Sequence, residues 1–252
     1  MTSDPAKIPN VARMYDYYLG GKDNFTVDRE AADRVLELVP EIRAGAMASR
    51  AFLRRAVQAL SELGVDQFVD IGSGLPTVGH VHESAPEASV LYVDNDPVVL
   101  AHSRALLPTG ERVFVREGDL REPEKIMATA AELLDFSRPV AVLLVSVLHF
   151  VTDEEDPAGI VAAIREALPS GGYLVLTHVA PDARPERAPQ VSAVYQRASA
   201  PFTARRRPEF ERFLAGLELL EPGIVNNQEW RPVTPPVEEV GDYHLVAVGR
   251  KP

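Results

Sequence analysis

From residue 68 onward, short apolar runs alternate with stretches in which apolar positions recur every three to four residues. The runs predict strands at FVDI 68–71, VLYVD 90–94, RVFVRE 112–117, VAVLLVSVLHF 140–150 and YLVLTHV 173–179. The periodic stretches, such as 97–107 and 157–168, predict helices. Strands that alternate with helices form parallel sheets with right-handed crossovers, and continuously apolar strands are covered on both faces. The pattern therefore predicts an α/β fold with helices on both faces of a sheet.

The N-terminal part of the chain has helical spacing and no strand pattern. It predicts a helix that begins after Asn10, a second at 28–38 and a third from about 47 to 63. Gly64 then follows as a stop signal. We expect this helical preface, residues 1–63, to lie against the edge of the sheet or over its top.

The C-terminal part predicts a helix at 208–217 and a strand at 218–225. A proline-rich loop at 231–242 then leads to a last strand at 243–251. Two strands joined without a helix predict an antiparallel pair. No shift in composition marks a domain boundary, so we expect a single domain over 1–252, in which the preface is followed by a Rossmann-like core at 64–252.

Composition and charge narrow the classes of partner. The chain has 252 residues, of which 46% are apolar, so a large core is expected. Its net charge of −11 repels a phosphate backbone, and the basic cluster at 205–207 is interpreted as a solvated helix start, so no nucleic-acid partner is expected. The longest apolar run, 140–151, is too short to span a bilayer. The absence of cysteine and of a secretory signal pattern favours a cytoplasmic location, and no spacing predicts a metal site.

The first predicted strand runs into a glycine turn, with Asp70 followed by Gly72, Ser73 and Gly74. Such a turn lets a backbone approach a nucleotide closely at the carboxyl end of a parallel strand. A dinucleotide fingerprint needs a third glycine, and Thr77 stands there instead. The pattern D-x-G-x-G is typical of S-adenosylmethionine sites. Another Rossmann-type nucleotide site and a purely structural turn stay open as alternatives.

Acidic residues also end the next two strands. Asp94 is placed to accept both ribose hydroxyl protons, as in nicotinamide and S-adenosylmethionine sites alike, and Asn95 is expected to line an adenine pocket. Asp119 is expected to accept from the exocyclic amine of adenine, with Leu120 against the ring. We interpret Asp96, which precedes a proline, as a helix cap.

Taken together, DIGSG, YVDNDP, GDL and SVLHF resemble the motifs of a class I methyltransferase. The N-terminal RMYDYYLGGKDNFTVDREAA and SRAFLRRAV narrow the resemblance to a bacterial family of S-adenosylmethionine-dependent methyltransferases, formerly a domain of unknown function. The resemblance extends from about residue 8 to 250. It implies a seven-stranded sheet whose last strand is inserted antiparallel, with S-adenosylmethionine as cofactor.

The fourth predicted strand carries Ser146 and His149 at its carboxyl end. Ser146 is expected beside the methionine portion of the cofactor. His149 is the candidate general base, because imidazole titrates near neutrality. The alternative is a histidine that is hydrogen-bonded into a helix start. His178, at the end of the fifth strand, is a lesser candidate.

The preface offers further polar groups. Its tyrosines and the Gly20-Gly21 pair favour either an amphipathic helix packed on the sheet or a lid that closes over cofactor and acceptor. In the lid, Tyr18 and Asn24 would contact the cofactor, and Arg50 would pair with its carboxylate. The segment 180–204, which contains Tyr195, is a second candidate lid.

These observations predict methyl transfer from S-adenosylmethionine to oxygen or nitrogen of a small-molecule acceptor. Two alternatives stay open at this point: a nicotinamide-dependent oxidoreductase, and a protein that binds S-adenosylmethionine without turning it over.

Overall fold

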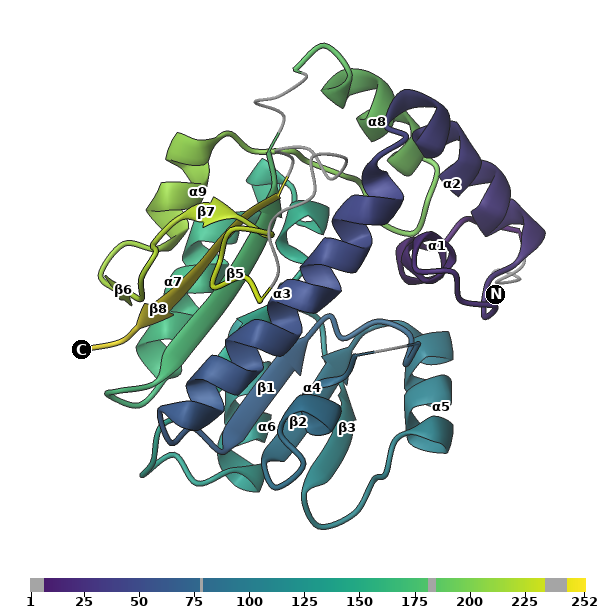
Figure 1. Cartoon of the computed structure of the whole chain (residues 1–252). Helices are drawn as coiled ribbons and strands as arrows, with labels where there is room; N and C mark the ends of the chain where they lie inside the picture. The colour runs from purple at the N-terminus through teal and green to yellow at the C-terminus, as the bar shows by residue number, and fades with distance from the viewer. Residues whose placement is uncertain (1–6, 78, 181–184, 234–243) are drawn as a thin grey trace.

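The computed structural model describes residues 7–77, 79–180, 185–233 and 244–252. In this part of the chain, a central sheet has the strand order β3-β2-β1-β4-β5-β8-β6, and β7 also pairs with β8 (Figure 1). The strands are β1 Gln67–Ile71, β2 Ser89–Asp94, β3 Val113–Glu117, β4 Ala141–Leu144, β5 Tyr173–Val179, β6 Glu218–Leu219, β7 Val225–Asn226 and β8 His244–Arg250. β1 to β5 pair in parallel, and β8 is inserted antiparallel beside β5. The predicted sheet is confirmed.

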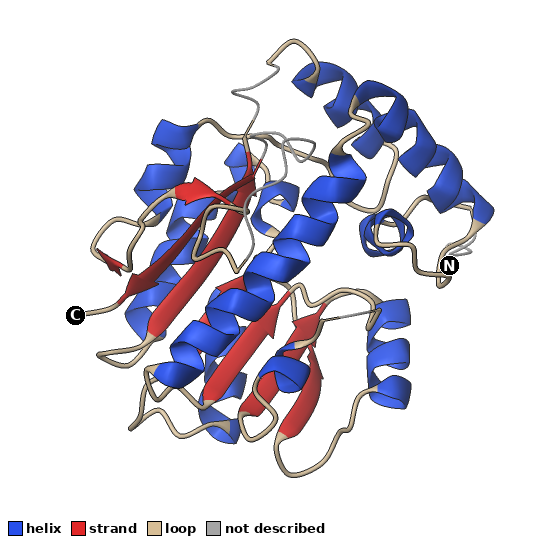
Figure 2. Ribbon diagram, in the orientation of Figure 1, coloured by secondary structure: helices blue, strands red, loops and turns tan. Residues whose placement is uncertain are grey.

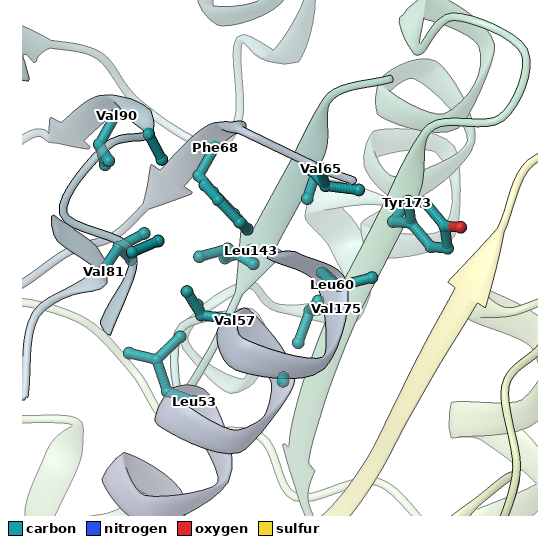
Figure 3. Packing of buried hydrophobic residues seen from close by; sticks show 14 of the residues in the cluster. Leu53, Val57, Leu60, Val65, Phe68, Val81, Val90, Leu143, Tyr173 and Val175 are labelled. Atoms are coloured by element: carbon teal, nitrogen blue, oxygen red, sulfur yellow. The ribbon is translucent and has the colours of Figure 1, made fainter. Parts of the chain in front are cut away.

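Helices cover both faces of this sheet (Figure 2). One face carries α3 (Ile42–Glu62), α4 (Val81–Ser84) and α5 (Pro97–Leu106). The other face carries α6 (Pro123–Leu133), α7 (Pro157–Ala167) and α9 (Arg207–Phe213). Figure 3 shows the first core, where α3 meets the strands through Leu53, Val57, Leu60, Phe68, Leu143 and Val175. Burying each of these side chains stabilises the fold by about 1.5–3 kcal/mol.

A third cluster lies beyond the carboxyl ends of the strands. It is formed by α1 (Val11–Tyr18), α2 (Thr26–Leu38), the start of α3 and α8 (Ala188–Tyr195), which gather on one side of the molecule in Figure 1. The helical preface is therefore present as predicted, and α8 joins it. No helix within the described ranges is both long and apolar enough to cross a membrane.

Polar contacts fix the preface to itself and to the core. Asn10 caps α1 by accepting from the N–H of Arg13, and its amide donates to Asp96 Oδ2 at 2.6 Å. Asp96 itself caps α5, as predicted. The buried Arg13 and Asp28 pair at 2.6 Å and join α1 to α2. The N-termini of α1 and α5 are thus held together by two linked caps.

Two predicted strands differ from the structure. The apolar run 140–150 is a strand only as far as Leu144, because Ser146 adopts a left-handed backbone (φ 58°) and its N–H donates to Thr177 Oγ1 rather than continuing the ladder. A short 3₁₀ turn, η1 (Leu148–Phe150), follows. The run 218–225 is divided into β6 and β7, because Pro222 has no N–H to donate and Gly223 turns the chain with φ +83°.

The predicted second lid, the proline-rich loop and the start of α3 can also be compared with the structure. The segment 180–204 contains α8 in addition to loop. Residues 181–184 of that segment, and residues 234–243 of the proline-rich loop, lie outside the described residues. α3 begins at Ile42, five residues before its expected start at 47.

Candidate functional site

A cleft lies at the carboxyl ends of β1 to β4, where parallel sheets place their ligands. We call it the strand-end cleft. It contains about 990 Å³ of empty space including its mouth. Ten of the twelve residues predicted to bind cofactor line it: Arg50, Asp70, Gly72, Ser73, Gly74, Asp94, Asn95, Asp119, Leu120 and Ser146.

The glycine turn has the backbone that its sequence predicts. Gly72 and Gly74 have φ of +71° and +68°, in the left-handed region. The Gly72 N–H donates to Val93 O at 2.8 Å, which binds the turn to β2. A Cβ on Gly72 would lie 2.3 Å from Val147 Cγ2, whereas one on Gly74 would meet nothing nearer than Arg50 Nη2 at 3.8 Å. The turn therefore leaves open space over Gly74.

Asp94 joins the turn to the end of β2. Its Oδ2 accepts the Gly74 N–H at 2.9 Å, and its Oδ1 accepts the Asp96 N–H at 3.0 Å. Burial raises the pKa of the Asp94 carboxyl, although these two N–H groups oppose the rise. Each carboxylate oxygen can accept a second hydrogen bond, so Asp94 keeps capacity for the hydroxyls of a ligand.

Asp119 is held by its neighbours at the end of β3. Its Oδ2 accepts from Asn95 Nδ2 at 3.0 Å and its Oδ1 accepts from the Arg121 N–H at 2.9 Å. Burial alone would raise the pKa of Asp119, but these donors and the Arg121 charge lower it overall. The carboxyl is therefore ionised at neutral pH. Arg121, which also lines the strand-end cleft, is a residue that the sequence analysis missed, although it follows the GDL motif directly.

Asp70 and Arg50 bring opposite charges to the cleft. Burial raises the pKa of Asp70 to about 6; Arg50 lowers it and Asp94 raises it further. The guanidinium of Arg50 lies 5.4 Å from the Tyr15 ring centroid. Its buried Nε has no hydrogen-bond partner within the described ranges. Because an unpartnered buried donor is costly, it marks a place for an anionic ligand group.

A second cavity adjoins the strand-end cleft. We call it the apolar cavity; it contains about 890 Å³ of empty space. The two share Val11, Tyr15, Ser146 and Phe150, so Ser146 stands on the boundary between them. The walls of the apolar cavity include residues of α1, the start of α3, η1 and α8.

His149 faces the apolar cavity and does not line the strand-end cleft. Burial, and then the neighbouring His178, His244 and Arg205, lower the pKa of His149 well below its usual value. The imidazole is therefore uncharged at neutral pH. Among the described residues, its buried Nδ1 has no hydrogen-bond partner.

Arg205 shapes the wall that carries His149. Predicted to be solvated, it is 3% exposed and pairs with Asp153, and its guanidinium donates to Val151 O at 2.8 Å. The prediction of a solvated helix start was wrong for Arg205, which fills a pocket between η1 and β5 that no local pattern shows. Arg206 and Arg207 are exposed at the start of α9, as predicted. Its Nη1 also lies 3.1 Å from His178 Nε2. His178, with a pKa of about 3 lowered chiefly by burial, is thus occupied by Arg205 and by Val179 O.

The two preface residues predicted to contact the cofactor lie elsewhere. Tyr18 lines the apolar cavity, and its hydroxyl is 3.3 Å from the hydroxyl of Tyr195 on α8. Asn24 lines neither cavity, because its amide donates to Asp16 Oδ2 at 2.8 Å and to Gly21 O at 3.0 Å. The two candidate lids therefore meet over the apolar cavity through a tyrosine pair.

Asp16 is a second residue that the sequence analysis missed. It is 1% exposed, and its Oδ1 accepts from Thr77 Oγ1 at 2.6 Å. Thr77, which replaces the third glycine of a dinucleotide fingerprint, therefore fastens α1 to the glycine turn. Throughout the described ranges, no cluster of three or more histidine or acidic side chains is arranged to hold a metal ion.

Comparisons with known proteins agree with this geometry. A family model described as S-adenosyl methyltransferase matches residues 3–252. The crystal structure of a DUF574 family protein from Streptomyces avermitilis is 38% identical, with a TM-score of 0.92 over 98% of this chain and 99% of that one. A candidate methyltransferase from Thermobifida fusca is also 38% identical, with a TM-score of 0.90 over 97% and 95% of the two chains.

More distant structures share the fold. Magnesium protoporphyrin IX methyltransferase from Synechocystis, solved with S-adenosylhomocysteine bound, is 13% identical and has a TM-score of 0.58 over 95% of this chain and 93% of that one. No curated protein matches the sequence.

Proposed function

The chain belongs to the S-adenosyl methyltransferase family, and from this premise we propose that it methylates an oxygen or nitrogen atom of a small-molecule acceptor. S-adenosylmethionine is its cofactor, and we propose that the strand-end cleft holds it. The observation that carries this proposal is the convergence of Asp70, Asp94 and Asp119 on one cleft that also contains an unpartnered arginine donor.

The residues of the cleft match the parts of the cofactor. Asp94 would accept the ribose hydroxyls, and Asn95, Asp119 and Leu120 would hold the adenine. Arg50, with its buried unpartnered Nε, would donate to the carboxylate of the methionine portion, and Asp70 would face its ammonium. The open space over Gly74 admits a ligand against the backbone.

Methyl transfer needs alignment and a place for one proton. When bound, S-adenosylmethionine supplies a methyl group whose bond to sulfur breaks, with the electron pair staying on sulfur, as the bond to the acceptor forms. Ser146, on the boundary between the two cavities, would lie beside that methyl group. His149 would take the proton of the acceptor at Nδ1, and the walls of the apolar cavity would exclude water.

The lowered pKa of His149 is compatible with this role. The imidazole is unprotonated at neutral pH and can accept a proton. The acceptor proton becomes strongly acidic as the new bond forms, because positive charge develops on the attacking atom. A weak base therefore suffices, provided that it is held in place.

The cofactor site can be tested by titration calorimetry with S-adenosylhomocysteine. Asp94→Ala removes the proposed ribose acceptor; hydrogen bonds to charged groups contribute about 1.5–3 kcal/mol each, so we expect binding to weaken at least about thirtyfold. Glu117→Ala is the matched control, because Glu117 pairs in register with Asp94 at the end of β3 but does not line the cleft. Equal affinity of the two variants, or no binding to the unmodified chain, would contradict the proposal.

The acceptor can be sought with radiolabelled S-adenosylmethionine in a metabolite extract. We expect labelled product with the unmodified chain and at least about a hundredfold slower transfer with His149→Gln, because general base catalysis contributes about 10²–10⁴-fold. Cofactor affinity should be unchanged in that variant. Rapid transfer by His149→Gln would show that another group takes the proton.

We also propose that the preface and the Rossmann-like core act as one methyltransferase domain over residues 1–252. The supporting observations are the contacts of Asn10 with Asp96 and of Asp16 with Thr77, which join α1 to the ends of two core segments.

A further inference from the structure

The apolar cavity has a composition that discriminates between classes of acceptor. Aliphatic side chains from the preface and from α8 form part of its wall, among them Val39, Ile42 and Val191. Aromatic rings form another part. Tyr195 and Phe202 are stacked with centroids 5.1 Å apart, and Phe150 lies 5.8 Å from Tyr195. A wall of this kind binds flat apolar molecules through burial and offset ring contacts.

Among the described residues, the lining of this cavity includes one acidic and one basic side chain, Glu41 and Arg187. Burial lowers the pKa of His244 to about 4, and it lowers the pKa of His149 well below the usual value. Burial raises the pKa of Tyr195 to about 12, so its hydroxyl is un-ionised. An ion that entered would lose its hydration without meeting a net opposite charge, which is costly.

Hydrogen-bonding groups occur at two places in this apolar wall. His149 lines the cavity, and its buried Nδ1 has no hydrogen-bond partner among the described residues. The hydroxyls of Tyr18 and Tyr195 lie 3.3 Å apart and bond to each other. Since Ser146 joins the cavity to the strand-end cleft, an acceptor held here would reach the cofactor from the side of His149.

From these three features we infer that the acceptor is an uncharged ring compound that carries a hydroxyl group, such as a phenol, and that it binds in the apolar cavity with its hydroxyl at His149. This inference rests on the proposed function and selects oxygen as the acceptor atom. An amine would arrive largely as an ammonium ion at neutral pH, for which the described lining residues offer no net negative charge. In the reaction the hydroxyl oxygen gains the methyl group and its proton passes to His149.

The experiment compares three probes with the same ring and different charge. 2-Naphthol is neutral at pH 7, 2-naphthoate is an anion and 2-naphthylmethylammonium is a cation. Each is titrated into the chain saturated with S-adenosylhomocysteine. We expect 2-naphthol to bind at least tenfold more tightly than either ion. The inference is overturned if 2-naphthol does not bind, or if an ion binds equally well, while S-adenosylhomocysteine binds normally.

The location is tested by two substitutions on α8. Val191 lines the apolar cavity and is buried, whereas Ala193 on the same helix is exposed. Val191→Asp should weaken 2-naphthol binding at least tenfold, and Ala193→Asp should leave it unchanged. Since Val191→Asp can also disturb folding, Ala188→Trp is made as well, because Ala188 is only half-buried and its larger side chain would fill the cavity.

The affinity for S-adenosylhomocysteine reports whether each variant is folded, and it should stay within twofold of the unmodified chain. Unchanged 2-naphthol binding in both cavity variants would overturn the location. If S-adenosylhomocysteine fails to bind the unmodified chain, the proposed function is at fault. The comparison of the three probes is then made without it and still tests the inference.

Discussion

Replacing Gly72 by alanine separates the backbone requirement of the glycine turn from its steric requirement. Gly72 has φ +71°, and a Cβ there would lie 2.3 Å from Val147 Cγ2 and 2.8 Å from Val147 Cβ. Gly64 has φ +87° and would place its Cβ in open space. Gly64→Ala therefore carries only the cost of a left-handed backbone, about 1–2 kcal/mol. Gly72→Ala adds the cost of overpacking, about 1–3 kcal/mol.

Urea unfolding measures this difference directly. We expect Gly72→Ala to be less stable than Gly64→Ala by about 1–3 kcal/mol, with equal dependence of the free energy of unfolding on urea. Gly74→Ala extends the series, because its Cβ meets nothing nearer than Arg50 Nη2 at 3.8 Å. It should be as stable as Gly64→Ala and should bind S-adenosylhomocysteine more weakly. If Gly72→Ala and Gly64→Ala are equally stable, the close approach of Val147 does not constrain the turn, and the reasoning is refuted.

Other predictions concern charged groups. Arg50→Met should weaken the binding of S-adenosylhomocysteine at least about tenfold in calorimetry. The affinity for 5′-methylthioadenosine, which lacks the amino-acid portion, should stay unchanged; an equal loss of affinity for both ligands would contradict the pairing of Arg50 with the carboxylate. Asp28→Asn should lower the free energy of unfolding by about 3–5 kcal/mol, because it removes the negative charge from the buried ion pair of Arg13 and Asp28; a loss below 1 kcal/mol in urea unfolding would contradict this. His178 has a folded pKa of about 3, so the unfolded state binds its proton first as the pH falls. This histidine should therefore contribute roughly 2 kcal/mol to the stability that is lost between pH 7 and pH 5. The total loss should be smaller by that amount in His178→Gln and unchanged in the control His102→Gln.

The activity should have a related pH dependence. Because the pKa of His149 lies well below 6.5, the imidazole stays unprotonated between pH 8 and pH 6. With S-adenosylmethionine saturating, so that titration of Asp70 does not limit cofactor binding, we therefore expect methyl transfer to be flat over this range, whereas a histidine with an ordinary pKa would lose about three quarters of its base form at pH 6. A fall of that size in the radiolabel assay, absent in His149→Gln, would show that His149 titrates normally.

The strand-end cleft could be predicted from the sequence because its signals are local. Each of Asp70, Asp94 and Asp119 directly ends a predicted strand, and the carboxyl ends of parallel strands lie at one edge of a sheet. The cap at Asp96 was equally local, since it precedes a proline at the first helical position. Motifs of this kind need no knowledge of distant contacts.

The apolar cavity could not be predicted in the same way. β4 ends where the N–H of Ser146 turns to Thr177, 31 residues further along the chain, and this turn carries His149 away from the cleft. Arg205 is buried by partners from η1 and β5 that its own neighbours do not reveal. Which preface side chain lines a cavity depends on the rotation of α1 and on the path of the segment after it. Tyr18 ends α1 and lines the apolar cavity, whereas Asn24 lies beyond α1 and bonds to Asp16.

The two cavities share a wall that α1 forms, and this has a consequence for how ligands are released. Val11 and Tyr15 on α1 border the strand-end cleft and the apolar cavity alike. If α1 tilted away, it would open both cavities together, so spent cofactor and methylated product would be released in the same step.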